Sequence, residues 1–180
     1  MLQDKQMKFK RFRSINRNQR GFTLIELIVA VAITSLLAAG ATMAIFQVFS
    51  QSSRSTDYMS ASKHALNAVY WVSRDAQMAQ TVNPDVTSGF PLVLSWVEWD
   101  NSSHQVTYTL TAGKLSRQYS IDGGAPSESV VAQFINSDNA MTTCGLSGGV
   151  VTLKITATLG EGSDATNVTK LRDITPRPGL

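Results

Sequence analysis

The chain has 180 residues, a length that suits one ordinary domain with an appended segment. Its 43% hydrophobic content excludes wholesale disorder, and its single cysteine, Cys144, excludes an internal disulfide framework and a multi-cysteine metal site. The formal net charge is +3, yet the first 20 residues hold seven basic side chains and one acid, a net of +6. The rest of the chain is therefore net −3, and all of the excess positive charge lies ahead of Gly21.

An apolar run from Leu27 to Phe46 follows the basic segment and contains no charged residue. As a helix with a rise of about 1.5 Å per residue, this run reaches about 30 Å, the thickness of the hydrocarbon core of a bilayer. We expect it to span the membrane. The basic flank predicts that residues 1–20 lie in the cytoplasm and that the chain beyond Ser50 lies outside.

The acid Glu26 stands at the head of this apolar run. An ionised carboxylate at the bilayer centre costs about 2.5–3.5 kcal/mol, so an acid near a span usually has a partner. If the chain were cut after Gly21, the new α-amino group of Phe22 would lie one helical turn from Glu26, or could pair with Glu26 of a neighbouring chain. The alternative is that Glu26 merely marks the membrane interface.

The segment around the acid resembles a known signal. Placed between a basic leader and an apolar span, Gly21-Phe22-Thr23-Leu24-Ile25-Glu26-Leu27 resembles the class III signal of type IV prepilins and type II secretion pseudopilins, a resemblance that covers residues 1–50. In this family a membrane aspartyl peptidase cuts after the glycine and methylates the new N-terminal residue. The resemblance implies cleavage between Gly21 and Phe22, N-methylation of Phe22 and a role for Glu26 in assembly. It also implies three partners, namely a prepilin peptidase/methyltransferase, other pilin or pseudopilin subunits, and an inner-membrane assembly platform.

A conventional secretory signal is the alternative to this interpretation. Such a signal also has a basic start and an apolar core, and Ala39-Gly40-Ala41 could be its small-residue cleavage site. The apolar run continues beyond that point to Phe46, however, and a carboxylate at the start of the apolar region is unexpected in a secretory signal.

The second half of the helix is predicted by its periodicity. From Asp57, apolar residues recur at steps of three and four, and their stripe is narrow and rich in alanine, which suits close packing on a sheet. We expect the helix to end at Asn83-Pro84, because proline disfavours helical geometry in its predecessor. The polar residues 47–56 are either a continuation of the helix or a local loosening.

Residues 90–160 predict four or five strands, at residues 92–99, 106–110, 115–121, 130–135 and 151–156. Ala112-Gly113 is expected to turn a hairpin, residues 136–149 to form a long loop, and the tail from Gly160 to be mobile.

These elements predict a pilin-like α+β fold. A long N-terminal α-helix, transmembrane in its first half, would pack through its second half on a small, mostly antiparallel β-sheet. The expected parts are a cleaved basic leader (1–21), a hydrophobic transmembrane and assembly helix (22–50), the amphipathic second half of the helix (51–83), and a β-rich head with a mobile tail (84–180).

Two looser patterns resemble minor pseudopilins of the J type and the related W-type minor pilins. The first is Trp71-Val72-Ser73-Arg74-Asp75-Ala76-Gln77, near the end of the expected helix. The second is Val106-Thr107-Tyr108 followed by Gly113-Lys114-Leu115-Ser116-Arg117, in the expected hairpin.

Residues that could carry chemistry are few. His64 and His104 lie on different elements without acids or cysteines at ligand spacing, so we expect solvated side chains and neither a metal site nor a cofactor. Cys144 is expected to be a free thiol or a buried small residue. Asp122 and Asp138 lie in turn-like sequences without the regular spacing of a calcium loop, and no catalytic motif indicates an enzyme. The three tryptophans are expected in the core or on a sheet face.

The predicted function is therefore structural. We expect a minor pilin or pseudopilin that assembles into, or initiates, a type IV pilus-like filament, with the type II secretion pseudopilus favoured. It would reside first in the inner membrane as a single-pass protein, then in a filament in the periplasm or at the cell surface. Direct nucleic-acid binding is not expected, because the part beyond Gly21 is net −3 without a basic cluster. A signal-anchored extracytoplasmic binding or sensor protein is the alternative.

Overall fold

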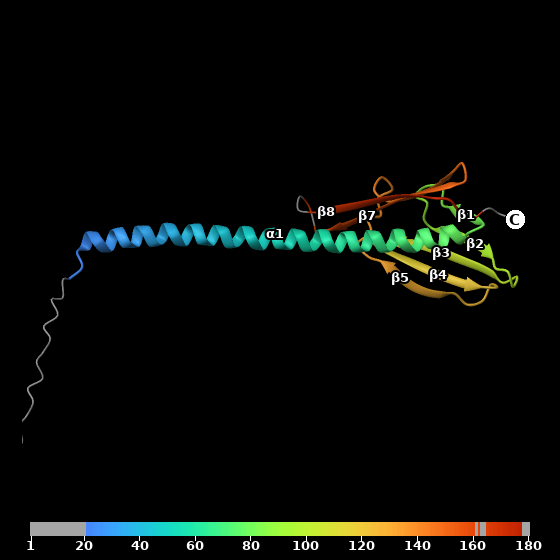
Figure 1. Cartoon of the computed structure of the whole chain (residues 1–180), viewed down its shortest axis with the longest axis horizontal. Helices are drawn as coiled ribbons and strands as arrows, with labels where there is room; N and C mark the ends of the chain where they lie inside the picture. The colour runs from blue at the N-terminus through green and yellow to red at the C-terminus, as the bar shows by residue number, and fades with distance from the viewer. Residues whose placement is uncertain (1–20, 161, 163–164, 178–180) are drawn as a thin grey trace, which may run out of the picture. The chain divides into compact units, whose positions relative to one another are not determined.

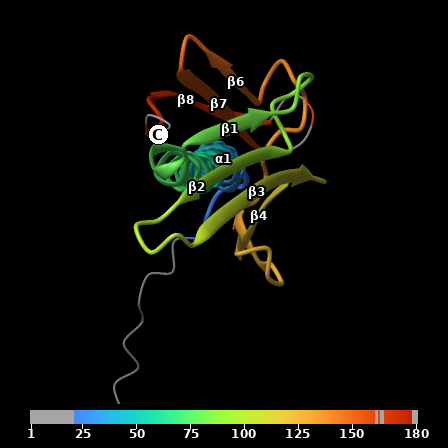
Figure 2. The same ribbon diagram turned by 90° about the vertical axis from the view of Figure 1, so that its right-hand side faces the viewer.

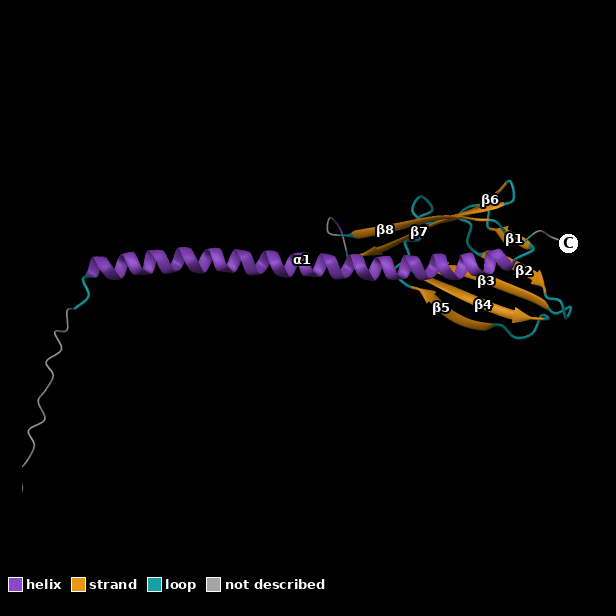
Figure 3. Ribbon diagram, viewed as in Figure 1, coloured by secondary structure: helices purple, strands orange, loops and turns teal. Residues whose placement is uncertain are grey.

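The computed structural model describes residues 21–160, 162 and 165–177, so the basic leader lies outside the described residues apart from Gly21. The described residues form one α-helix and eight strands: α1 (Leu24–Met78), β1 (Thr81–Pro84), β2 (Leu92–Val97), β3 (Ser103–Thr111), β4 (Lys114–Ile121), β5 (Ser127–Ala132), β6 (Thr143–Ser147), β7 (Val150–Leu159) and β8 (Thr166–Ile174) (Figure 3). They divide into two compact units, one ending at Gln47 and the other beginning at Val48.

The strands of the second unit form two antiparallel sheets. One sheet has five strands in the order β1-β2-β3-β4-β5, and the other has three in the order β6-β7-β8, so each sheet follows the chain without a crossover (Figure 1). Neighbouring strands are joined by short connections, as an antiparallel meander allows. The turn at Ala112 and Gly113 has positive φ at both residues (49° and 74°), as the predicted two-residue hairpin requires.

The part of α1 in the second unit lies between the two sheets, which flank it in the end-on view (Figure 2). Its buried positions include four alanines, which allow the backbones of the sheets to approach closely. One continuous core joins the helix to both sheets, with Val72, Leu94, Tyr108, Leu153 and Ile155 all fully buried. The sheets meet where β1 lies beside β6, and there the Cys144 N–H donates a hydrogen bond to the Ser88 carbonyl over 3.2 Å.

The α+β prediction is confirmed, with two sheets in place of one. Five of the eight strands were predicted, although their limits differ by a few residues. The polar segment 47–56 continues the helix without interruption. The helix ends at Met78, five residues before the predicted stop, because Thr81–Pro84 pairs with β2 as strand β1.

Besides β1, two more strands lie where none was expected. The predicted loop 136–149 contains β6, whose Cys144 and Leu146 pair with Leu153 and Val151 of β7. The segment after Gly160 contains β8, which pairs with β7 over nine residues and places Val168 and Ile174 in the core. Both strands pair with β7, which is ten residues long and forms hydrogen bonds with β6 along one edge and β8 along the other.

Candidate functional site

The segment around Glu26 begins helix α1 through a side-chain cap. The Thr23 hydroxyl accepts a hydrogen bond from the Glu26 N–H over 3.3 Å, and the Thr23 carbonyl accepts the first helical bond, from the Leu27 N–H, over 3.2 Å. Thr23 is therefore the N-cap and Glu26 the third helical residue, the spacing of a capping box. Sequence reasoning missed this role, although Thr-x-x-Glu ahead of an apolar run is its signature.

The position of Glu26 in the first turn also has an electrostatic consequence. The first N–H groups of a helix are unsatisfied and give that end a partial positive charge, which stabilises a carboxylate in the first turn. Glu26 is exposed, and its carboxylate forms no ion pair with any residue that the structure describes.

Every residue from Gly21 to Thr56 is exposed, which is unusual for side chains of this composition. Phe22, Leu36 and Phe46 are 82%, 76% and 69% exposed. Within the described chain, α1 is the one helix that contains a stretch long and apolar enough to cross a membrane, with a mean hydropathy of 2.3. Such a surface is stable in lipid or against other apolar helices and unfavourable in water.

The three hydroxyl groups of the apolar run are satisfied by the helix itself. Thr34, Ser35 and Thr42 donate hydrogen bonds to the carbonyls of Ala30, Val31 and Ala38, four residues earlier, over 2.9, 2.6 and 2.8 Å. A polar group in hydrocarbon must find its partner within the protein, and these side chains do so without a second helix. They therefore add little to the cost of placing the run in lipid.

A second polar constellation lies inside the head, where Asp75 of α1 meets Tyr108 of β3 and Arg117 of β4. Arg117 donates from Nε and Nη2 to the two carboxylate oxygens of Asp75, over 2.6 and 3.2 Å, and the Tyr108 hydroxyl donates to the same carboxylate. The Asp75 side chain is 1% exposed and that of Arg117 15%. The guanidinium also lies over the rings of Trp71 and Tyr119, 5.5 and 5.0 Å from their centroids.

The electrostatics of this contact favour the protonated forms of Tyr108 and Arg117. Burial and the adjacent Asp75 charge raise the pKa of Tyr108 far above its usual value, so its hydroxyl remains a donor. Burial alone would lower the pKa of Arg117, but the hydrogen bonds and charge of Asp75 outweigh it and raise this pKa. The two loose sequence patterns, one around Asp75 and one containing Tyr108 and Arg117, are thus joined by a structural contact that fastens the helix to the sheet.

The two histidines lie on different elements, His64 on α1 and His104 on β3, and do not contact each other. His64 is half-buried; its Nδ1 accepts the Gln133 N–H over 3.3 Å, and burial, aided by the Lys63 charge, lowers its pKa. The expectation that both histidines are solvated is wrong for His104, which is buried between Trp96 and Tyr119. Its ring forms hydrogen bonds with Ser102 Oγ, two residues earlier, over 2.9 Å and with Tyr119 Oη over 2.6 Å, and the second contact requires the folded pair of β3 and β4. Among the described residues, no group of three or more His, Cys, Asp or Glu side chains could hold a metal ion.

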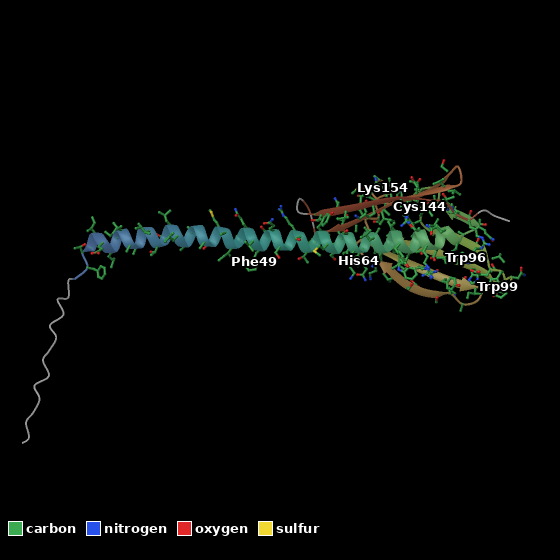
Figure 4. The ribbon with its side chains drawn as sticks, in the orientation of Figure 1. Phe49, His64, Trp96, Trp99, Cys144 and Lys154 are labelled. Atoms are coloured by element: carbon green, nitrogen blue, oxygen red, sulfur yellow. The ribbon has the colours of Figure 1, made fainter. Side chains whose placement is uncertain are left out.

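The remaining candidates have structural roles. Cys144 is buried in β6, and this burial raises the pKa of its thiol to about 12. Asp138 accepts the Ala140 N–H two residues on, as turn residues do, whereas Asp122 accepts the Ser103 N–H, 19 residues away in the sequence. Figure 4 shows Trp96 and Trp99 near one end of the head; Trp96 is in the core, whereas Trp99, expected in the core or on a sheet face, is 95% exposed in the β2–β3 connection.

Comparison with known proteins bears on the N-terminal segment. The family model of the prokaryotic N-terminal methylation motif matches residues 16–42, a stretch that contains the Thr23 cap, Glu26 and most of the apolar run. No curated protein and no solved structure matches the chain.

Residues 16–42 therefore carry the prokaryotic N-terminal methylation motif, which supports a type IV prepilin-like protein with a class III signal peptide. The motif marks a structural substrate of prepilin peptidase and implies assembly with other pilins. Together with the apolar helix, the motif indicates a membrane-anchored protein, and the long helix on antiparallel sheets is a pilin-like architecture.

Proposed function

We propose that this chain is a minor pilin or pseudopilin, a structural subunit that assembles into or initiates a type IV pilus-like filament. The observation that carries the proposal is the match to the methylation motif over residues 16–42. The apolar helix within this stretch is not covered by any other described part of the chain. On this proposal, a prepilin peptidase cuts between Gly21 and Phe22, and Phe22 is then N-methylated.

Glu26 would act in assembly through its charge. After cleavage, the amine of Phe22 lies at the start of an apolar helix four residues from Glu26, and a carboxylate of a neighbouring subunit can pair with it. In a bundle of such helices an unpaired charge would cost about 2.5–3.5 kcal/mol or more, so only the axial register that pairs the charges is favourable. The pair would thus determine register as well as attraction.

We also propose the J-type or W-type class of minor subunit, with the type II secretion pseudopilus as the favoured machine. The support is that the two sequence patterns resembling those classes meet in the structure, where Asp75 from one pattern contacts Tyr108 and Arg117 from the other. The precursor would lie in the inner membrane with its N-terminus in the cytoplasm, because residues 1–20 carry a net charge of +6.

The first experiment identifies the mature N-terminus. Mass spectrometry of the protein purified from membranes of its native host should find N-methyl-phenylalanine at Phe22, and Gly21→Val should leave an uncut precursor. A mature chain that begins at Met1, or at Thr42 after secretory cleavage, would reject the proposal in favour of a signal-anchored binding protein or a secreted one.

The second experiment separates processing from assembly. Glu26→Ala should be cut normally but should be lost from sheared filaments or from complexes with other subunits. Glu128→Ala, which removes an exposed acid from β5, is the matched control and should assemble as the wild type does. Normal incorporation of Glu26→Ala would refute the charge-pair mechanism while leaving the class of protein intact.

A further inference from the structure

A small open cleft lies between the end of α1 and the last strand of the head. Four of its lining residues come from α1 (Tyr70, Ser73, Arg74 and Gln77) and one, Arg172, comes from β8. Its volume is about 180 Å³, enough for several water molecules or a small polar group. The cleft is separate from the N-terminal segment and from the buried contact of Asp75.

Two guanidinium groups line this cleft from opposite elements. On β8, Arg172 is an even number of residues from the buried Val168 and Ile174, and side chains at such spacing share one face of a strand. The Arg172 side chain therefore leaves β8 on the side of the helix. Arg74 lies over the Trp71 ring, 5.5 Å from its centroid, and this stacking leaves the N–H edge of the guanidinium free to donate. Within the part of the chain that the structure describes, neither Arg74 nor Arg172 forms an ion pair.

The third observation is a buried hydroxyl without a partner. Ser73 is 3% exposed, and its Oγ forms no hydrogen bond with any described residue. Buried polar groups are almost always hydrogen-bonded, so such an atom needs an explanation. Ser73 lines the cleft, but its Oγ is enclosed as the side chain now lies, so the hydroxyl reaches an oxygen atom in the cleft only after rotation about χ1.

We propose that this cleft binds an oxyanion, either a carboxylate or a phosphate group. Two arginines converging on one space repel each other when it is empty, and an anion between them would receive charge-assisted hydrogen bonds from both. The Gln77 amide lies at the same cleft as a further donor, and the Ser73 hydroxyl would donate once it has rotated toward the anion. The site does not depend on the role of the N-terminal signal.

Calorimetric titration of the full chain in non-ionic detergent micelles tests the proposal. Inorganic phosphate and acetate are the two probes, each against chloride at equal ionic strength. We expect saturable binding of at least one probe: phosphate alone would identify a phosphate group as the ligand, and acetate binding would identify a carboxylate. Arg172→Gln should weaken the binding by about tenfold, since it removes one charged donor, and Ser73→Ala by a smaller factor.

The control is Lys114→Gln, which removes the same charge from an exposed position of β4 and should bind as the wild type does. Arg172 is exposed, so Arg172→Gln should fold, and its Tm without anion should equal or exceed that of the wild type because the repulsion is relieved. Absence of saturable binding by either probe, or equal binding by the wild type and Arg172→Gln, would overturn the proposal. So would a Tm of Arg172→Gln well below that of the wild type, which would indicate a structural role for this arginine.

Discussion

Removing the Arg117 guanidinium tests whether the buried carboxylate of Asp75 controls the stability of the head. In the Arg117→Met variant a side chain of similar length still covers the sheet, but Asp75 loses two of its three hydrogen-bond donors and its only ion-pair partner among the described residues. Asp75 is 1% exposed, so water cannot replace these donors without opening the core.

The expected loss follows from these contacts. Breaking a buried ion pair by removing one partner destabilises a protein by about 3–5 kcal/mol. We expect the lower end, about 3 kcal/mol, because Tyr108 still donates to the carboxylate and the guanidinium was itself 15% exposed. For a head of this size such a loss lowers Tm by about 10 °C.

Urea unfolding of the full chain in detergent micelles, followed by tryptophan fluorescence, measures this loss. Trp71 lies against Arg117 and reports directly on the contact. Lys114→Met, on the same strand but exposed, is the matched control and should change stability by less than about 0.5 kcal/mol. In the double-mutant cycle with Asp75→Asn, we expect a coupling energy of about 2 kcal/mol. A loss below about 1 kcal/mol, or coupling near zero, would refute the reasoning.

Three further predictions concern the head. In Gly89→Ala the added Cβ would lie 1.9 Å from the Cys144 carbonyl oxygen at a φ of +81°, so we expect a loss of more than about 2 kcal/mol in urea unfolding, whereas Gly145→Ala meets open space. Native Cys144, buried and with a thiol pKa of about 12, should resist iodoacetamide at mildly alkaline pH and react once unfolded; fast labelling of the native chain would contradict its burial. The lowered pKa of His64 means that the unfolded chain binds its proton more readily. Stability should therefore fall as the pH drops through 6.5, by less than about 1 kcal/mol because the ring is partly exposed, and His64→Asn should lack this dependence.

The N-terminal segment could be predicted because its signals are local. A charge-free run of membrane length, a basic flank and an acid at one fixed position are all properties of consecutive residues. Even the Thr23 cap, which was not predicted, has a local sequence signature of four residues, Thr-x-x-Glu. The roles of Gly21, Phe22 and Glu26 remain predictions for the experiments on processing and assembly.

The head was less predictable because its decisive contacts are distant in sequence. Strand β3 alternates clearly, β2 is a short apolar run and β4 follows the predicted hairpin turn, so all three were predicted, whereas β8 carries three charged residues and buries only Val168 and Ile174. Its strand conformation is imposed by pairing with β7, a non-local effect that outweighs local preference. Likewise, 33 and 42 residues separate Asp75 from Tyr108 and Arg117, so no local pattern could pair them.

The position of β8 constrains when the head can fold. This strand follows all the others in the chain, yet Val168 and Ile174 belong to the same core as the alanines of α1. Until β8 has been made and has paired with β7, one side of the helix lacks its cover, and the chain exposes apolar surface of the kind that proteases and chaperones recognise. A subunit interrupted before Thr166 would thus lack Val168 and Ile174 and leave part of its core open, so a complete head requires the last strand to be made.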